Sequence, residues 1–355
     1  MKKSIFLSVL ALAAVVSCQK SEIVDSKYGN EAIGFETYTG RDAQTKATVA
    51  STFTTAGIYG FYTGVNMWNG TGTNTVANPK ANLWSDKENE TLTAGGVVSP
   101  TKYWTNDSDY YSFLAYAPKA VASYTYLTSA LDEAGSNPTL TYTVPTTLAD
   151  QTDLLYAFAI DQQKPKTTAG ATSTVALTFK HALSRIAVQA CEKHEDYVYT
   201  IKGLTLTGNF VQTNTFDLKT GEWEAVTEQT AKETGSYTFV LPSGKVAVNG
   251  ATPVSCVGEN YLMVIPADVE NATLTVAYTT TYGEGTEAIE SNLITKTVKV
   301  TNDFEQGKAY ALNLEFGPNA ADAIGFSVTV DTWGTENSVN VTPVNPEEGT
   351  VVSGN

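Results

Sequence analysis

The stretch Ala32–Gly40 reads "AIGFETYTG", and Ala323–Asp331 reads "AIGFSVTVD" near the other end of the chain. Both alternate apolar residues with small or polar ones. A period of two is typical of a β-strand with one buried face, whereas a helix repeats about every 3.6 residues. Each stretch is therefore predicted to form one complete strand, and the two strands are expected to offer similar faces.

The sequence between these two stretches also has the composition of β-strands. Runs rich in Val, Thr, Tyr and Phe recur at short intervals and are separated by Gly, Asn, Asp and Pro, which favour turns. Examples are YYSFLAYAP, TLTYTVP, LLYAFAI, VALTFKHAL, YLMVIPA, TLTVAYTTTY and YALNLEF. No long window has the apolar repeat of a helix, so the fold is predicted to be all-β and built from β-sandwiches.

Length and charge limit the possible functions. The chain has 355 residues, of which 42% are hydrophobic and 17% charged, enough apolar surface for two domains. Its formal net charge is −15 at pH 7. A strongly acidic chain is a poor partner for nucleic acid or for an anionic membrane surface, and we expect neither.

The N-terminus reads MKKSIFLSVLALAAVVSC, with a basic start followed by a short apolar run. This pattern is typical of a secretory signal peptide, here residues 1–17, because the run is too short to cross a bilayer. The ending "VVSC" resembles a bacterial lipobox, which predicts an exported protein tethered through a lipid on Cys18. An unmodified Cys18 is the alternative.

The clearest candidate for a boundary within the chain is Asp161–Thr174, which is rich in Pro, Gly, Lys and Thr and poor in apolar residues. We interpret it as a linker between an N-terminal sandwich, residues 18–165, and a C-terminal sandwich, residues 166–355. A long hairpin loop inside one domain has the same composition and remains the alternative.

Several phrases, taken in order, resemble the fimbrillin family of Bacteroidia, the type V pilins and their relatives. They follow the lipobox cysteine and cover nearly the whole chain. The phrases are AIGFETYTGRDAQTKATV, YWTNDSDYYSFLAYAPKA, TDLLYAFA, LTFKHALSRIAV, YLMVIPA, FEQGKAYALNLEF and IGFSVTVDTW. The resemblance implies two transthyretin-like β-sandwich domains in tandem.

The resemblance also implies a mode of assembly. A lipoprotein precursor reaches the outer membrane, a trypsin-like protease removes an N-terminal segment with the first strand, and a C-terminal strand of another subunit fills the vacancy. In this chain the removable strand is predicted at about residues 31–40, with Ile33, Phe35 and Thr37 facing inward. Adding a strand in trans satisfies a free sheet edge and covers apolar side chains.

The donor strand is predicted within about residues 323–353, and the sequence leaves open which strand it is. IGFSVTVDTW is also a candidate for the closing strand of the second domain, with Trp333 in its core. The chain continues beyond Trp333 with another alternating stretch, SVNVTPV. The candidate donor residues are Ile324, Phe326, Val328, Val330, Val339 and Val341.

Two cations mark the candidate processing site. Between Lys27 and Lys80 the only basic residues are Arg41 and Lys46, which flank a polar stretch directly after the predicted first strand. A trypsin-like protease needs a cation and an accessible, extended backbone, so cleavage is predicted after one of them. Read without the resemblance, both are ordinary solvated charges.

Nothing in the sequence favours catalysis, a cofactor or a strong metal site. His181 and His194 have no nearby nucleophile and no metal-ligand spacing, and a structural or solvated role suits them better. Asn106–Tyr111 lacks the glycine and terminal Glu of a calcium loop and is predicted to form an Asx turn. Cys191 and Cys256 are either disulfide-bonded or separate thiols.

Taken together, these patterns predict a structural stalk subunit of surface fimbriae. Its expected partners are other pilin subunits, a processing protease, the outer membrane through the lipid, and a receptor on a host or bacterial surface. The alternative is a tip adhesin, or a non-polymerising surface lipoprotein, that binds glycan or host protein through its sandwich faces. No enzymatic activity is expected.

Overall fold

The structure is a computed structural model that describes residues 31–39, 53–68, 90–119, 124–127, 138–165, 174–193, 197–226, 232–258, 260–283, 288–317 and 323–333. Within these ranges the chain is all-β, as predicted, and its only helical elements are the 3-10 turns η2 (Leu148–Asp150) and η3 (Pro242–Gly244). None of the described helices has the length and apolar character needed to span a bilayer.

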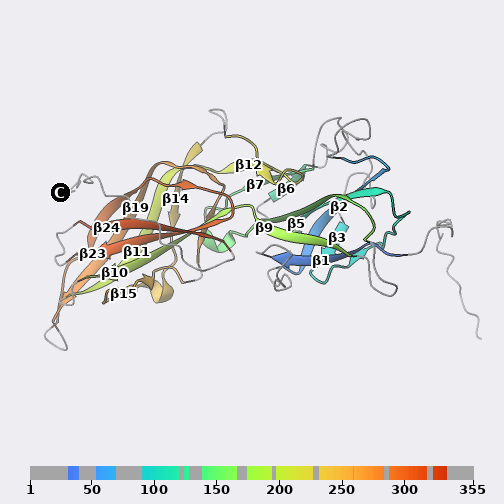
Figure 1. Cartoon of the computed structure of the whole chain (residues 1–355). Helices are drawn as coiled ribbons and strands as arrows, with labels where there is room; N and C mark the ends of the chain where they lie inside the picture. Colours follow the sequence, from blue (N-terminus) through green and yellow to red (C-terminus); the bar gives the residue numbers. More distant parts are fainter. Residues whose placement is uncertain are drawn as a thin grey trace, which may run out of the picture.

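One half of the molecule, on the right in Figure 1, contains two sheets. The larger has seven strands, in the order β1 (Gly34–Thr39), β9 (Thr174–His181), β8 (Leu155–Gln162), β5 (Tyr110–Ala117), β2 (Thr55–Gly64), β3 (Glu90–Thr93) and β4 (Val98–Ser99). The smaller has four, in the order β13 (Glu222–Trp223), β12 (Thr213–Asp217), β7 (Thr139–Thr143) and β6 (Tyr124–Leu127).

The other half also contains two large sheets (Figure 1). One holds β16 (Val254–Ser255), β10 (Ser184–Glu192), β23 (Lys308–Phe316) and β24 (Gly325–Thr332), with β17 (Leu262–Val264) also pairing β10. The second holds β14 (Lys232–Thr238), β11 (Tyr197–Val211), β19 (Glu270–Tyr282) and β20 (Ile289–Glu290), with β15 (Val246–Val248) on β11 and β21 (Ile294–Val300) on β19. A short pair joins β18 (Ala267–Asp268) to β22 (Asp303–Phe304).

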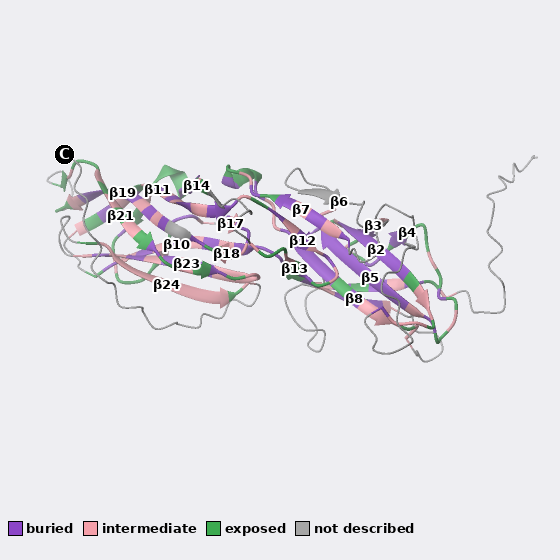
Figure 2. Cartoon of the chain, turned by 90° about the horizontal axis from the view of Figure 1, so that it is seen from above, coloured by how far each residue is buried: buried purple, intermediate pink, exposed green. Residues whose placement is uncertain are grey.

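The seven-stranded sheet is apolar on both faces, which explains the continuous apolar run of β5. Successive side chains of a strand point to opposite faces. Phe113 and Ala115 enter one buried cluster, whereas Leu114 and Tyr116 enter the other. By contrast, β10 alternates buried and partly exposed residues along its length, as expected for a strand buried on one face. Figure 2 shows β5 as largely purple and β11, in the other half, as banded.

The first cluster lies within the curled seven-stranded sheet. It contains Ile33, Phe35, Phe53, Ile58, Leu92, Trp104, Tyr111, Phe113, Val175, Leu177 and Phe179 among others. The second cluster runs from the space between the seven- and four-stranded sheets into the other half of the molecule. Because apolar packing is continuous across the junction of the halves, they share one core there.

The predicted linker lies inside a sheet. Asp161–Thr174 joins the end of β8 to the start of β9, and these strands are antiparallel neighbours that pair at Leu155–His181 and Tyr156–Lys180. This connection is the hairpin alternative, so a boundary at residue 165 separates two strands of the same sheet. The chain enters the other half through Ala182 and Leu183, both fully buried.

A later segment also returns to the first half. β12 follows β11 of the second half, yet it pairs antiparallel with β7, and β13 extends the same sheet. Composition gives no hint of this return, because the segment is an ordinary short hairpin in sequence.

Candidate functional site: the slot of the first strand

The strand β1 lies at the edge of the seven-stranded sheet. Residues 31–39 form backbone pairs with β9 on one side and, through the residues just before β1, with residues 102–104 on the other. From Gly34 to Thr39 the strand runs parallel to β9, with Gly34 opposite Thr174 and Thr39 opposite Phe179. The residues just before it run antiparallel to residues 102–104, where the Ile33 amide donates to the Lys102 carbonyl at 2.8 Å. We call the space that residues 31–39 fill the β1 slot.

The inward side chains of β1 are well buried. Ile33, Phe35 and Thr37 are 7%, 4% and 4% exposed, on the face that the alternation predicted. The Phe35 ring meets the Phe113 ring edge to face, with centroids 5.0 Å apart. Burying Ile33 and Phe35 contributes roughly 3–6 kcal/mol in total, so an emptied slot exposes a strongly apolar surface.

The far end of the sheet closes over β1. The Thr37 hydroxyl donates to the carbonyl of Ala94 at 2.7 Å, in the turn between β3 and β4. In the same turn Gly96 has a φ of +80°, and a β-carbon placed on it would lie 1.9 Å from the Phe35 carbonyl oxygen. Only glycine suits both the positive φ and this close approach. The sheet therefore curls into a nearly closed wall around the first cluster.

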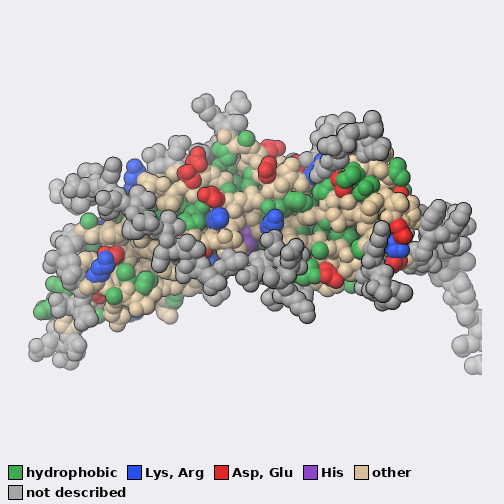
Figure 3. Space-filling model, in the orientation of Figure 1, with side chains coloured by type: hydrophobic (Ala, Val, Ile, Leu, Met, Phe, Trp, Pro, Cys, Tyr) green, Lys and Arg blue, Asp and Glu red, His purple; other side chains and the backbone are tan. Residues whose placement is uncertain are grey.

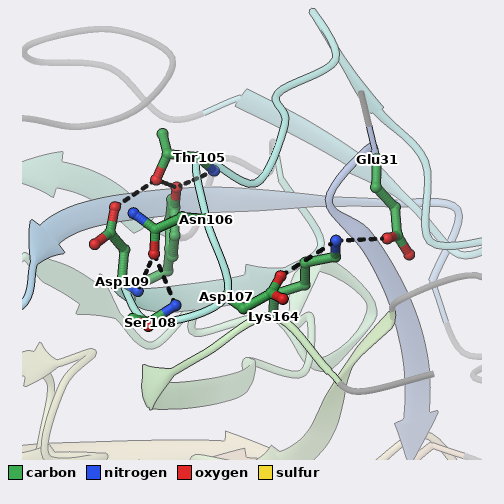
Figure 4. A network of polar contacts seen from close by, with 8 residues as sticks. Glu31, Thr105, Asn106, Asp107, Ser108, Asp109 and Lys164 are labelled. Carbon is green, nitrogen blue, oxygen red and sulfur yellow. Dashed lines mark hydrogen bonds and ion pairs between the residues drawn. The ribbon is translucent and has the colours of Figure 1, made fainter. Parts of the chain in front are cut away.

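A polar group fixes the chain where it enters the slot. Lys164, just after β8, lies with its Nζ 3.0 Å from Glu31 Oε2 and 3.4 Å from Asp107 Oδ1 (Figure 4). The hydrogen bond that Lys164 donates to Glu31 is the main reason that the pKa of the Lys164 amino group is raised above its ordinary value. No sequence pattern points to Lys164, because its position beside Glu31 depends on the packing of β8 against distant segments.

The loop that carries Asp107 is the predicted Asx turn, and this prediction is confirmed. Asn106 Oδ1 accepts from the amides of Ser108 at 2.7 Å and Asp109 at 2.9 Å (Figure 4). Asp109 is 4% exposed and accepts from the hydroxyls of Thr105 and Tyr62. The oxygen-rich stretch is thus held by internal hydrogen bonds.

β24, which carries the candidate donor residues Phe326, Val328 and Val330, forms the edge of its own sheet. It pairs antiparallel with β23 from Gly325 to Thr332. Its residues are at most half-buried, in contrast to those of β1. The side chains of Phe326, Val328 and Val330 pack on the second cluster, together with that of Ile324 just before the strand.

Trp333 ends the described part of this region at the junction of the two halves. Its ring stacks on His181 with centroids 4.0 Å apart, and the guanidinium of Arg185 lies 5.4 Å from its centroid. His181 Nδ1 also lies 2.6 Å from Asp153 Oδ2. His181 therefore has the structural role that the sequence indicated, as the last residue of β9.

The two cysteines of the second half are free thiols. Cys256 is fully buried, and burial raises its thiol pKa to about 12, whereas Cys191 lies on the partly exposed face of β10. Because the thiolate is the reactive form, we expect iodoacetamide at pH 8 to label Cys191 in the folded protein and Cys256 only after unfolding. Peptide mapping after timed labelling measures this, and equal rates at both positions would contradict it.

Several predicted positions lie outside the described residues: Cys18, Arg41, Lys46, His194, Val339 and Val341. Among the residues that the structure describes, no group of three or more His, Cys, Asp or Glu side chains could hold a metal ion. On the face drawn in Figure 3, the described Lys and Arg side chains are scattered among acidic and uncharged ones and do not form a broad basic patch.

The comparisons with known proteins agree with the architecture. The model of the fimbrillin-like family matches residues 45–333. The chain belongs to the fimbrillin-like family. This membership indicates a fimbrial role at the cell surface, the coarse form of the function that the sequence predicted.

One solved structure supports the fold, and two others are matched with lower TM-scores. A fimbrial protein from Bacteroides vulgatus superposes with a TM-score of 0.66 at 19% identity, over 86% of this chain and all of that one. A putative cell adhesion protein from Bacteroides uniformis (TM-score 0.48, 16% identity) is matched over 85% of this chain and 98% of that one. The fimbrial anchor protein Mfa2 from Porphyromonas gingivalis (TM-score 0.37, 10% identity) is matched over the same shares of the two chains. No curated protein sequence matches this fimbrillin-like chain significantly.

Proposed function

We propose that this fimbrillin-like chain is a structural subunit of a fimbrial stalk and that it assembles by strand exchange at the β1 slot. The proposal rests mainly on β1, an edge strand whose inward side chains are buried. Directly after β1 the sequence continues into the stretch that contains Arg41 and Lys46. An edge strand leaves a sheet with the loss of pairs to one neighbouring strand, here β9, and the residues before β1 lose in addition only the short pairing with residues 102–104. Cleavage after β1 would cut its covalent tie to the rest of the fold.

In this proposal the chain is exported, anchored by a lipid on Cys18 at the outer membrane, and then cleaved by a trypsin-like protease. Loss of residues 31–39 uncovers β9 and the side chains of Val175, Leu177, Phe179 and Phe113. An incoming strand restores the hydrogen bonds along β9 and covers the apolar surface, as in other cases of strand addition.

The domain plan belongs to the same proposal. Two tandem transthyretin-like sandwiches suit a stalk unit, with β1 to β9 in the first and most later strands in the second, except for β12 and β13, which return to the first. The buried junction helps to transmit force along the unit, because apolar packing and hydrogen bonds cross it. One of these hydrogen bonds runs from the Met263 amide to Gln151 Oε1 at 2.7 Å.

Limited trypsin treatment of the purified chain tests the proposal. We expect a new N-terminus after Arg41 or Lys46, identified by mass spectrometry, followed by SDS-resistant ladders on gels. The double variant Arg41→Gln, Lys46→Gln should give neither product. Cleavage without ladders would favour the alternative role of a tip adhesin or monomeric surface lipoprotein, and ladders from the uncleaved double variant would overturn the mechanism.

A further inference from the structure

The group formed by Lys164, Glu31 and Asp107 lies where a strand enters the β1 slot (Figure 4). The side chains of Lys164 and Glu31 are 21% and 30% exposed, whereas that of Asp107 is 73% exposed. The Lys164–Glu31 pair is thus the more sheltered of the two contacts, and partly buried ion pairs are screened less by salt than fully exposed ones.

Both partners of Lys164 are held in place by backbone contacts. The carbonyl of Glu31 accepts from the Trp104 amide at 3.1 Å, which fixes the start of the strand. Asp107 belongs to the Asx turn that Asn106 closes. Because Asp107 does not belong to the strand in the slot, it would keep Lys164 at the entrance when Glu31 leaves.

The Ala-Ile-Gly-Phe sequence that occurs near both ends of the chain is preceded in each case by an acidic residue. Glu31-Ala-Ile-Gly-Phe35 has its counterpart in Asp322-Ala-Ile-Gly-Phe326. In both, a carboxylate stands two residues before the first inward apolar side chain, and the aromatic ring follows two residues after that. The other candidate donor stretch differs, because Asn337 stands two residues before Val339.

We propose that Lys164 selects and sets the register of the strand that fills the β1 slot, by pairing with Glu31 of its own chain and then with Asp322 of a second copy. This inference rests on the proposed function. With Asp322 at Lys164, the side chains of Ile324, Phe326 and Val328 take the places of Ile33, Phe35 and Thr37. The donor is therefore the segment 322–333, whose strand β24 has to leave its pairing with β23 before it can fill the slot of another copy.

Register needs such a device because the side-chain period of a strand is two. A slip of one residue turns every inward side chain outward, and the apolar alternation of β24 continues long enough to allow a slip of two. A charge pair at one end distinguishes these registers. Its effect is on specificity and on encounter rate more than on total affinity.

Binding of synthetic peptides to the trypsin-treated chain, after the protease is inhibited, tests the inference. The probes are the peptide Asp322–Trp333 and the same peptide with Asp322→Lys. We expect the treated wild-type chain to bind the acidic peptide about tenfold more tightly. The variant Lys164→Glu should reverse the preference, and Lys164→Gln should abolish it. Lys299→Glu, a change at an exposed position on β21 in the other half of the molecule, is the matched control and should leave it intact.

The other possible binding results would contradict either the role of Lys164 alone or the β1 slot as well. If both peptides bind equally and Lys164→Glu changes nothing, the slot survives as an acceptor and the role of Lys164 is wrong. If neither peptide binds the treated wild-type chain, both the slot and the role of Lys164 are wrong. Circular dichroism of each variant before treatment, together with the milder Lys164→Gln change, separates misfolding from a loss of selection.

Discussion

Replacing Phe35 with alanine is expected to lower the free energy of unfolding by about 3 kcal/mol, because Phe-to-Ala changes in cores remove apolar contacts and leave a cavity. Phe35 is 4% exposed and packs on Phe113. Urea unfolding measures the global effect. Hydrogen exchange of the amides of residues 34–39 measures the local one, and we expect their protection to fall more than that of β10.

Phe158→Ala is the matched control, because it removes the same ring from a position that is 38% exposed on β8. We expect it to cost less than about 1 kcal/mol, as surface changes usually do. Equal losses for Phe35→Ala and Phe158→Ala, or unchanged exchange in β1, would mean that Phe35 does not anchor the strand. Under the proposed function, Phe35→Ala should also form ladders faster after cleavage, because the resident strand leaves more readily.

Replacing Gly96 with alanine is expected to cost about 3 kcal/mol, from backbone strain and a steric clash together. The new β-carbon would meet the Phe35 carbonyl oxygen at 1.9 Å, and the residue would keep a φ of +80°. The clash involves two backbone segments, so the turn between β3 and β4 must move away from β1. The same unfolding and exchange measurements apply, and the loss of protection should again centre on residues 34–39.

The variant Gly244→Ala separates the cost of backbone strain from the cost of the steric clash. Gly244 has a φ of +73°, but a β-carbon added to it would have open space around it, with nothing within 4 Å beyond its chain neighbours. A left-handed backbone alone costs an ordinary residue about 1–2 kcal/mol, so this control should fall in that range and leave β1 protected. If Gly96→Ala costs no more than Gly244→Ala, the turn does not press on β1.

The local features of the fold could be predicted from the sequence. The alternation in Ala32–Gly40 predicted a strand with Ile33, Phe35 and Thr37 on one face, and these residues are buried together. The Asx turn at Asn106 was also readable, because its hydrogen bonds join residues two and three positions apart. In both cases the deciding interaction depends on short-range geometry.

The interpretation of Asp161–Thr174 as a linker shows the limit of composition. Polar, Gly-containing segments connect domains and strands alike, and only the pairing of β8 with β9 distinguishes them. The return of β12 to pair with β7 is a second example. Strand order depends on contacts between residues far apart in the chain, which single-sequence periodicity does not encode.

By itself, the sequence determined the all-β class, the strand faces and the repeated strand motif, because side-chain alternation and turn chemistry act over a few residues. Only the tertiary structure decided that β1 is closed in by the Gly96 turn and that Lys164 reaches Glu31. Those contacts join segments that become neighbours when the seven-stranded sheet curls, and the curl results from packing the whole sheet around its apolar cluster.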